Sequence, residues 1–192
     1  MTLTVRNADV PCKVFKTHVE NHAQIKPSIL AAIAKLGVHS AITEFECISN
    51  TDWHINNNIA DLFKNKEYLN IVNPIIEMHN KQIAKYTGCN VVYTNHVWFQ
   101  QYNKSDYHAW HNHGNCMYSN VYYVELDKSC PNTSFRFMGT EFNIEVEEGD
   151  ILTFPSFMQH CSKPNKQNLR KTVIAFNSNA DGVIDEQILN TV

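Results

Sequence analysis

No hydrophobic run in the sequence reaches the ~18 residues that a membrane-spanning helix needs, so we expect no membrane span. The first ten residues, M-T-L-T-V-R-N-A-D-V, lack a basic segment followed by an apolar one, so we expect no signal peptide. A long run of lysine or arginine is also missing, and the net charge is −3. These features argue against nucleic acid as an obligatory partner.

No two of the six cysteines form a C-x-x-C pair, which argues against a zinc knuckle or a thioredoxin-type motif. We therefore expect reduced, mostly buried thiols in a cytoplasmic protein, in the host cytoplasm if the chain is viral. With 43% hydrophobic and 18% charged residues, the 192-residue chain has an ordinary globular composition. Its length predicts one domain spanning 1–192.

The first half of the chain predicts helices. Pro27 suits the first turn of a helix over 27–36, and Pro74 that of a longer helix over about 73–86, which Gly88 would end. A short helix at 59–64 and an outer strand or two within 1–24 are weaker predictions. We expect residues 1–89 to supply these supporting helices and outer strands.

From Asn90 to Asn177 the pattern changes to short β-rich runs separated by turn residues. Eight such runs predict a mainly β fold, a double-stranded β-helix (a jelly roll or cupin-like barrel) supported by the N-terminal helices. We expect the jelly-roll core over 90–177 and a surface tail over 178–192. The predicted strands are 91–102, 106–113, 117–126, 133–138, 142–147, 150–154, 158–162 and 170–177.

The strongest candidate site begins at His111 and His113, which would share one face of a strand because side chains alternate. Imidazole nitrogens on one face are a ready pair of metal ligands. His160 is a distant third candidate, and Arg170 follows it as a candidate anion clamp. Spacing alone leaves a solvated strand face open for the two histidines, a buried, satisfied residue for His160 and a surface ion pair for Arg170.

Four segments resemble the iron(II)/2-oxoglutarate-dependent oxygenases, most closely the bacterial and phage group related to prolyl hydroxylases. The resemblance runs from Val97 to Asn177, and Tyr102 stands nine residues before His111, as the family's tyrosine does. The chain departs from the family's H-x-D or H-x-E pattern at one point, where His113 occupies the carboxylate position. The segments are W-F-Q-Q-Y-N-K-S-D-Y-H-A-W-H-N-H, Y-S-N-V-Y-Y-V-E-L, G-D-I-L-T-F-P-S-F-M-Q-H and R-K-T-V-I-A-F-N.

The resemblance implies an Fe(II) centre on His111, His113 and His160, where 2-oxoglutarate and O2 would react. It further implies that Arg170 binds the far carboxylate of 2-oxoglutarate, with its planar fork matched to a carboxylate. The helper residues would be Thr172, on the same strand face, together with Tyr102 and Gln100.

The implied reaction is hydroxylation of an unidentified substrate, for which a peptidyl residue is one option, coupled to release of succinate and CO2. The expected partners are thus a small-molecule 2-oxo acid and a prime substrate that could be a protein, while the oligomeric state is open. Two alternatives remain at this point. One is a cupin-like three-histidine metal dioxygenase that does not use 2-oxoglutarate, and the other is a non-catalytic jelly-roll binding module.

Overall fold

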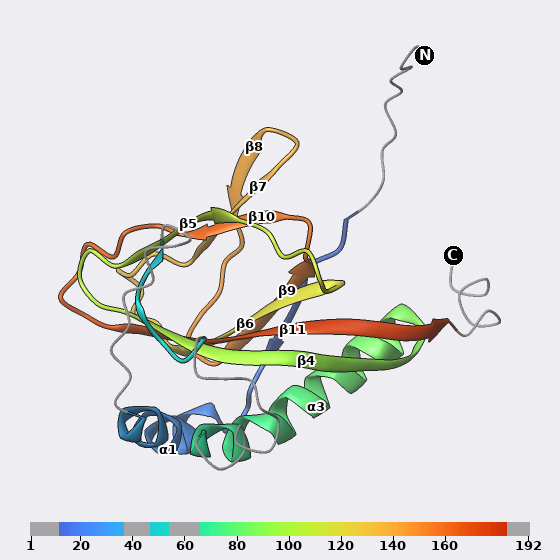
Figure 1. Cartoon of the computed structure of the whole chain (residues 1–192), viewed down its shortest axis with the longest axis horizontal. Coiled ribbons are helices and arrows are strands. Elements are labelled where there is room, and N and C mark those ends of the chain that lie inside the picture. The colour runs from blue at the N-terminus through green and yellow to red at the C-terminus, as the bar shows by residue number, and fades with distance from the viewer. Residues whose placement is uncertain (1–11, 37–46, 54–65, 184–192) are drawn as a thin grey trace.

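The computed structural model describes residues 12–36, 47–53 and 66–183. Within them two antiparallel sheets face each other, and two helices cover the outer side of the larger sheet (Figure 1). The larger sheet has the strand order β1-β9-β6-β11-β4-β3, and the smaller sheet β2-β5-β10-β7-β8. This arrangement confirms the predicted double-stranded β-helix with supporting N-terminal helices.

The bounds of the elements, in chain order, are β1 Phe15–His18, α1 His22–Lys35, β2 Cys47–Ile48, β3 Asn50–Thr51, α3 Glu67–Thr87, β4 Cys89–Tyr102, β5 Tyr107–His111, β6 Tyr118–Glu125, β7 Thr133–Phe137, β8 Thr140–Asn143, β9 Asp150–Pro155, β10 Gln159–Ser162 and β11 Lys171–Val183. The eight predicted core strands correspond in order to β4–β11, but the strand predicted at 142–147 shares only residues 142–143 with β8, because the hairpin with β7 begins earlier. The main difference is at the end of β11, which continues to Val183 because its last residues pair with the start of β4. The expected surface tail therefore begins as strand, and 184–192 lie outside the described residues.

Both helices begin earlier than the prolines predicted, at His22 and Glu67. Pro27 and Pro74 lie inside the helices, where each removes one backbone hydrogen bond. Burial of side chains on both sides of each proline offsets this loss. Gly88 ends α3 in the left-handed conformation, as predicted. The short helix predicted at 59–64 lies outside the described residues. Neither described helix has the length and apolar character needed to cross a membrane.

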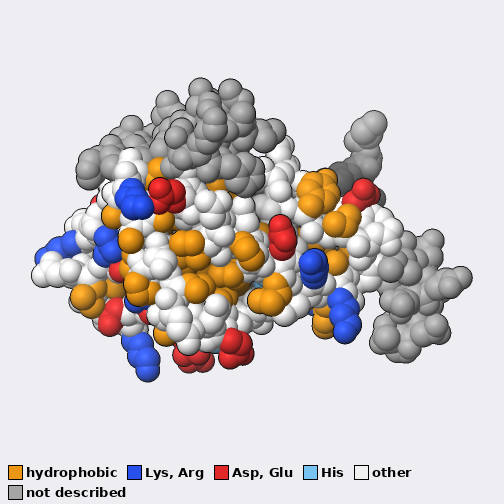
Figure 2. All heavy atoms as spheres, turned by 90° about the horizontal axis from the view of Figure 1, so that it is seen from below, with side chains coloured by type: hydrophobic (Ala, Val, Ile, Leu, Met, Phe, Trp, Pro, Cys, Tyr) orange, Lys and Arg blue, Asp and Glu red, His pale blue; other side chains and the backbone are white. Residues whose placement is uncertain are grey.

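Side-chain alternation divides the larger sheet between two cores. On β6, Tyr122 and Val124 pack against the helices, whereas Val121 and Tyr123 face the interior between the sheets. On the helix side, the buried residues of α1 and α3 complete the first core. The outer face of the helix layer carries gathered hydrophobic side chains among charges of both signs (Figure 2). The sheet is thus covered by helices on one side and left to line a barrel on the other.

A buried ion pair links the segment after β3 to the start of α3. Lys66 Nζ lies 2.8 Å from Asp52 Oδ2, and their side chains are 1% and 0% exposed. The same carboxylate accepts hydrogen bonds from the Tyr68 hydroxyl and from the Phe99 backbone N–H of β4. Asp52 therefore joins β3, α3 and β4 at one point.

We predict that Lys66→Met destabilises the protein by about 3–5 kcal/mol, because it leaves the buried Asp52 carboxylate without its cation. The matched control is Lys35→Met, which removes an exposed pair with Glu67 and should change stability by less than about 1 kcal/mol. Urea unfolding followed by far-UV circular dichroism measures both. Equal effects in the two variants would contradict a special role for the buried pair.

Candidate metal centre

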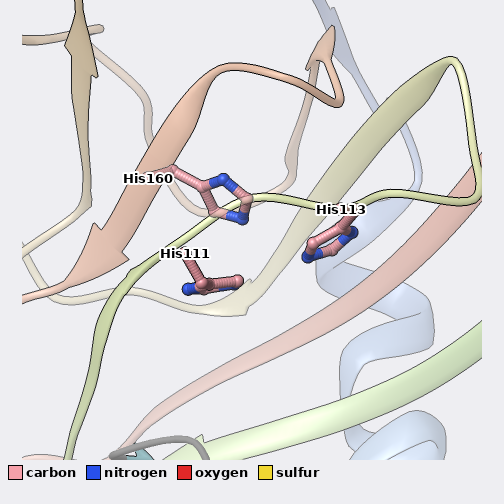
Figure 3. Close-up of side chains that lie close together, drawn as sticks. All are labelled: His111, His113 and His160. Atoms are coloured by element: carbon pink, nitrogen blue, oxygen red, sulfur yellow. The ribbon is translucent and has the colours of Figure 1, made fainter.

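Two of the three candidate histidines are neighbours across the smaller sheet. His111 of β5 pairs in register with His160 of β10, and their ring centres lie 4.2 Å apart. His113 lies beyond the end of β5, where its backbone N–H donates to the Ser156 carbonyl oxygen. One nitrogen of each ring lies within 4.8 Å of the others, and the rings converge in Figure 3. The structure therefore brings together the three histidines that the sequence predicted, although strand alternation does not extend to His113.

The hydrogen bonds of the three rings fix which nitrogen carries the proton. The Nδ1–H of His111 donates to the Ala109 carbonyl oxygen at 2.8 Å, and that of His160 donates to the Met158 carbonyl oxygen at 3.1 Å. His113 donates from Nδ1 to the Asn177 side-chain oxygen at 2.7 Å. Each ring consequently keeps a lone pair on Nε2, which is the form that a metal ligand needs.

Burial keeps these rings neutral. It lowers the pKa of His111 to about 4, lowers the pKa of His113, and holds that of His160 well below its usual value. Neutral imidazole is the state that binds a metal, so no proton has to leave at neutral pH. The donor set suits iron, zinc or copper.

One other group of metal-ligand type exists in the described residues, formed by His18, Glu147 and Asp150. Its acceptors are already used within the protein. His18 and Lys16 both contact the Asp150 carboxylate, at 2.9 and 3.6 Å. A metal ion would have to displace the lysine ammonium, so this group is the poorer candidate.

A narrow cavity of about 40 Å3 extends from the histidines into the barrel, and Gln100, Tyr102 and Lys171 line it. The Lys171 side chain is 2% exposed, and its Nζ donates to the Ser162 hydroxyl and the Pro131 carbonyl oxygen at 2.5 and 2.9 Å. Burial lowers the pKa of Lys171 to about 8. The interior therefore holds a buried ammonium group that the sequence interpretation had not selected.

Arg170 and Thr172 lie outside this cavity, on the opposite face of the chain from Lys171. The Arg170 side chain is 42% exposed and donates to both Glu125 carboxylate oxygens, at 2.8 and 3.1 Å. The Thr172 hydroxyl also donates to Glu125. Arg170 therefore forms a surface ion pair, the alternative considered for it above. Side chains alternate along β11, so Lys171 points into the barrel and its neighbours Arg170 and Thr172 point away from it. Alternation alone could not have identified Lys171, because the apolar residues of β11 at 173–176 lie on both faces of the strand.

His108 is a second residue that the sequence interpretation left out of the site. In a regular strand it would face away from His111, yet its ring stacks on His111 with centres 3.7 Å apart. A bulge explains this, since the four residues from His108 to His111 on β5 lie opposite the three residues from His160 to Ser162 on β10. Sequence spacing alone does not reveal such a bulge.

A larger cavity of about 450 Å3 opens beside the histidines and shares His108, His111 and His113 with the narrow one. Trp53 and Trp98 form part of its wall and meet edge to face, with ring centres 4.5 Å apart. The three candidate histidines thus all line the inner cavity, and His111 and His113 also line the wide mouth.

No family model matches the sequence, and no curated protein matches it. Solved structures do resemble the chain. A Pseudomonas putida prolyl-4-hydroxylase has a TM-score of 0.62 at 11% identity, with 88% of this chain and 93% of that chain covered. The viral collagen prolyl hydroxylase of Paramecium Bursaria Chlorella virus-1, in its 2OG complex, has a TM-score of 0.58 at 14% identity, with 86% and 94% covered.

The α-ketoglutarate-dependent carbocyclase SnoK of nogalamycin biosynthesis has a TM-score of 0.61 at 8% identity, covering 94% of this chain and 87% of that one. These likenesses are consistent with the superfamily that the sequence motifs resemble. At such identities they establish the fold, which is the double-stranded β-helix of the 2-oxoglutarate–Fe(II) oxygenases.

Proposed function

We propose that the protein is an Fe(II)- and 2-oxoglutarate-dependent dioxygenase that hydroxylates a substrate and releases succinate and CO2. The observation that carries the proposal is the pairing of three neutral, Nε2-presenting histidines with a buried lysine in one cavity. A chelating 2-oxo acid needs both a metal and a distant cation, and the fold of the neighbouring structures agrees with this use.

His111, His113 and His160 would hold the iron, which suits imidazole ligands and, when bound, supplies the activation of oxygen. The protein's own part is to fix the three Nε2 lone pairs in advance. It does so with acceptors that lie on the far side of each ring.

Lys171 would bind the far carboxylate of 2-oxoglutarate, the role that the resemblance had suggested for Arg170. An ammonium group has three donors, and Ser162 and Pro131 use two of them. Tyr102 and Gln100, which lie beside Lys171, remain candidate helpers, and Thr172 does not line the cavity. The cavity is smaller than a five-carbon diacid, so entry requires side-chain adjustment, for which the flexible lysine stem is suited.

The prime substrate would enter through the mouth cavity, which lies next to the histidines and is walled by Trp53 and Trp98. A peptidyl residue is our first choice, because two of the similar structures are prolyl hydroxylases. The third histidine also favours a second candidate, a three-histidine dioxygenase that does not use 2-oxoglutarate.

The deciding experiment incubates the protein with Fe(II), ascorbate and 2-oxoglutarate and measures succinate, with and without a peptide library. Succinate formed above a heat-denatured control supports the proposal. Iron binding without 2-oxoglutarate binding or succinate would favour the second candidate. A protein that binds no metal would be a jelly-roll binding module.

We predict that His160→Ala loses most of its affinity for Fe(II), because one of three ligands is missing. His113→Asp should bind the metal better than His113→Ala, since aspartate restores a common ligand set. His18→Ala is the control and should bind as the wild type does. Anaerobic calorimetric titration measures all four variants, and equal affinity of the two His113 variants would remove His113 from the ligand set.

We predict that Lys171→Met weakens 2-oxoglutarate binding by about 2–5 kcal/mol, as expected when one partner of a buried charge pair is removed. The matched control is the adjacent Arg170→Ala, which should barely change the affinity because Arg170 pairs with Glu125 outside the cavity. Titration of 2-oxoglutarate into the metal-loaded proteins decides between them. The reverse order of effects would return the anchoring role to Arg170.

We predict that 2-oxoglutarate affinity is constant at low pH and falls as the pH rises above about 8. Lys171 has a pKa of about 8 in the free protein, so below this pH it is already charged. Above it, binding the dianion must take up a proton, and the affinity falls by up to about tenfold per pH unit. Titrations between pH 7 and 9.5 measure this decline, which should be absent from Lys171→Met.

A further inference from the structure

The third histidine is held differently from the other two. His111 and His160 each donate to the carbonyl oxygen two residues earlier in the chain, that of Ala109 and that of Met158. Any residue offers a backbone carbonyl, so these bonds place no demand on the sequence. His113 instead donates to the side chain of Asn177 and lies 3.0 Å from the Ser119 hydroxyl. Its support therefore depends on which residues occupy two positions elsewhere in the chain.

Asn177 and Ser119 are cross-strand partners in the register of β11 and β6. Both side chains belong to the interior faces of their strands. On β11 this face includes Val173 and Ala175, and on β6 it includes Val121. Asn177 and Ser119 are therefore a polar pair on a mostly apolar face of the sheet, and both contact the His113 ring.

Asn177 lines the mouth cavity, and its side-chain oxygen lies 2.7 Å from Nδ1 of His113. Ser119 is 1% exposed, and a buried polar group of this kind is unfavourable unless it is hydrogen-bonded. The single Nδ1–H of His113 points to the Asn177 oxygen at 2.7 Å and can be shared with the Ser119 hydroxyl oxygen at 3.0 Å, while the Trp98 ring, 5.9 Å away, packs beside the imidazole.

We propose that Asn177, assisted by Ser119, is a positioning residue that fixes His113 in its Nδ1–H tautomer as a neutral third metal ligand. Three imidazoles would then be the working ligand set of this chain, and not a carboxylate triad that has lost a ligand. The inference rests on the proposed metal centre, and it concerns only how the chain builds that centre. It requires neither 2-oxoglutarate nor turnover.

The test measures Co(II) affinity by competition with a chelator, using the full-length chain. Asn177→Leu, similar in size but without an acceptor, should bind Co(II) about 10–100-fold more weakly, as is typical when the partner of a ligating histidine is lost. Asn177→Asp keeps the acceptor oxygen and should bind within a few-fold of the wild type. The control is Asn179→Leu, two residues along the same strand, where the side chain accepts from the Met117 backbone N–H.

A double-mutant cycle separates positioning from general damage to the fold. In the His113→Asp background the ring is gone, so Asn177→Leu should add little further loss of Co(II) affinity. In the chain that keeps His113, Asn177→Leu should also alter the visible spectrum of the Co(II) protein. If Asn177→Leu does not fold without metal, Asn177→Ala replaces it in the same cycle.

The outcomes distinguish this inference from the proposed function. Wild-type Co(II) binding with an unchanged Asn177→Leu affinity would overturn the positioning role and leave the metal centre intact. Equal weakening by Asn177→Asp and Asn177→Leu would mean that the amide N–H group faces His113, which overturns the tautomer. Absence of Co(II) binding by the wild type would overturn the proposed centre and this inference with it.

Discussion

The candidate site depends on the register of β11, which lies between β4 and β6 in the larger sheet. One face of this strand sends Ile174 and Phe176 into the core beneath the helices. The other face carries Lys171, which lines the inner cavity at the start of the strand, and Asn177, which contacts His113 near the middle of the strand. A register shift of one residue would exchange these faces and separate the cation from the histidines. Packing of the helices on the sheet therefore also fixes the chemistry inside the barrel.

The sequence predicted the parts of this arrangement that follow from regular patterns. Short β-rich runs gave the core strands, and the positions of His111, His113 and His160 identified the group that the structure brings together. Tyr102 and Gln100 line the cavity, and their part in binding 2-oxoglutarate stays a prediction. The strand predictions succeeded because β-rich runs and turn residues act locally, whereas His113 joins the group from beyond the end of β5, where alternation does not apply.

The features that the sequence interpretation missed depend on long-range pairing. Choosing Lys171 over Arg170 requires knowing which face of β11 lines the barrel. The spacing of the sequence motifs does not give this face. His108 joins the site through a bulge that is defined only by the partner strand. Pairing of β11 with β6 places Asn177 beside Ser119 and His113, although Asn177 lies 64 residues after His113 in the chain. Such residues are found by following the hydrogen bonds of a ligand outward.

The narrow cavity has the three histidines and Lys171 in its lining, so a bound metal and the ammonium group would both act on a ligand inside it. Among the described residues that line the narrow cavity no carboxylate is present, and the only charged side chain is Lys171. A divalent metal on three neutral imidazoles would keep its full charge, so metal and lysine would together attract a dianion from both ends. Because opposite charges in a buried site stabilise one another strongly, metal binding and binding of a 2-oxo acid should reinforce each other. A carboxylate ligand at position 113 would reduce this attraction, and the support of His113 by Asn177 preserves it.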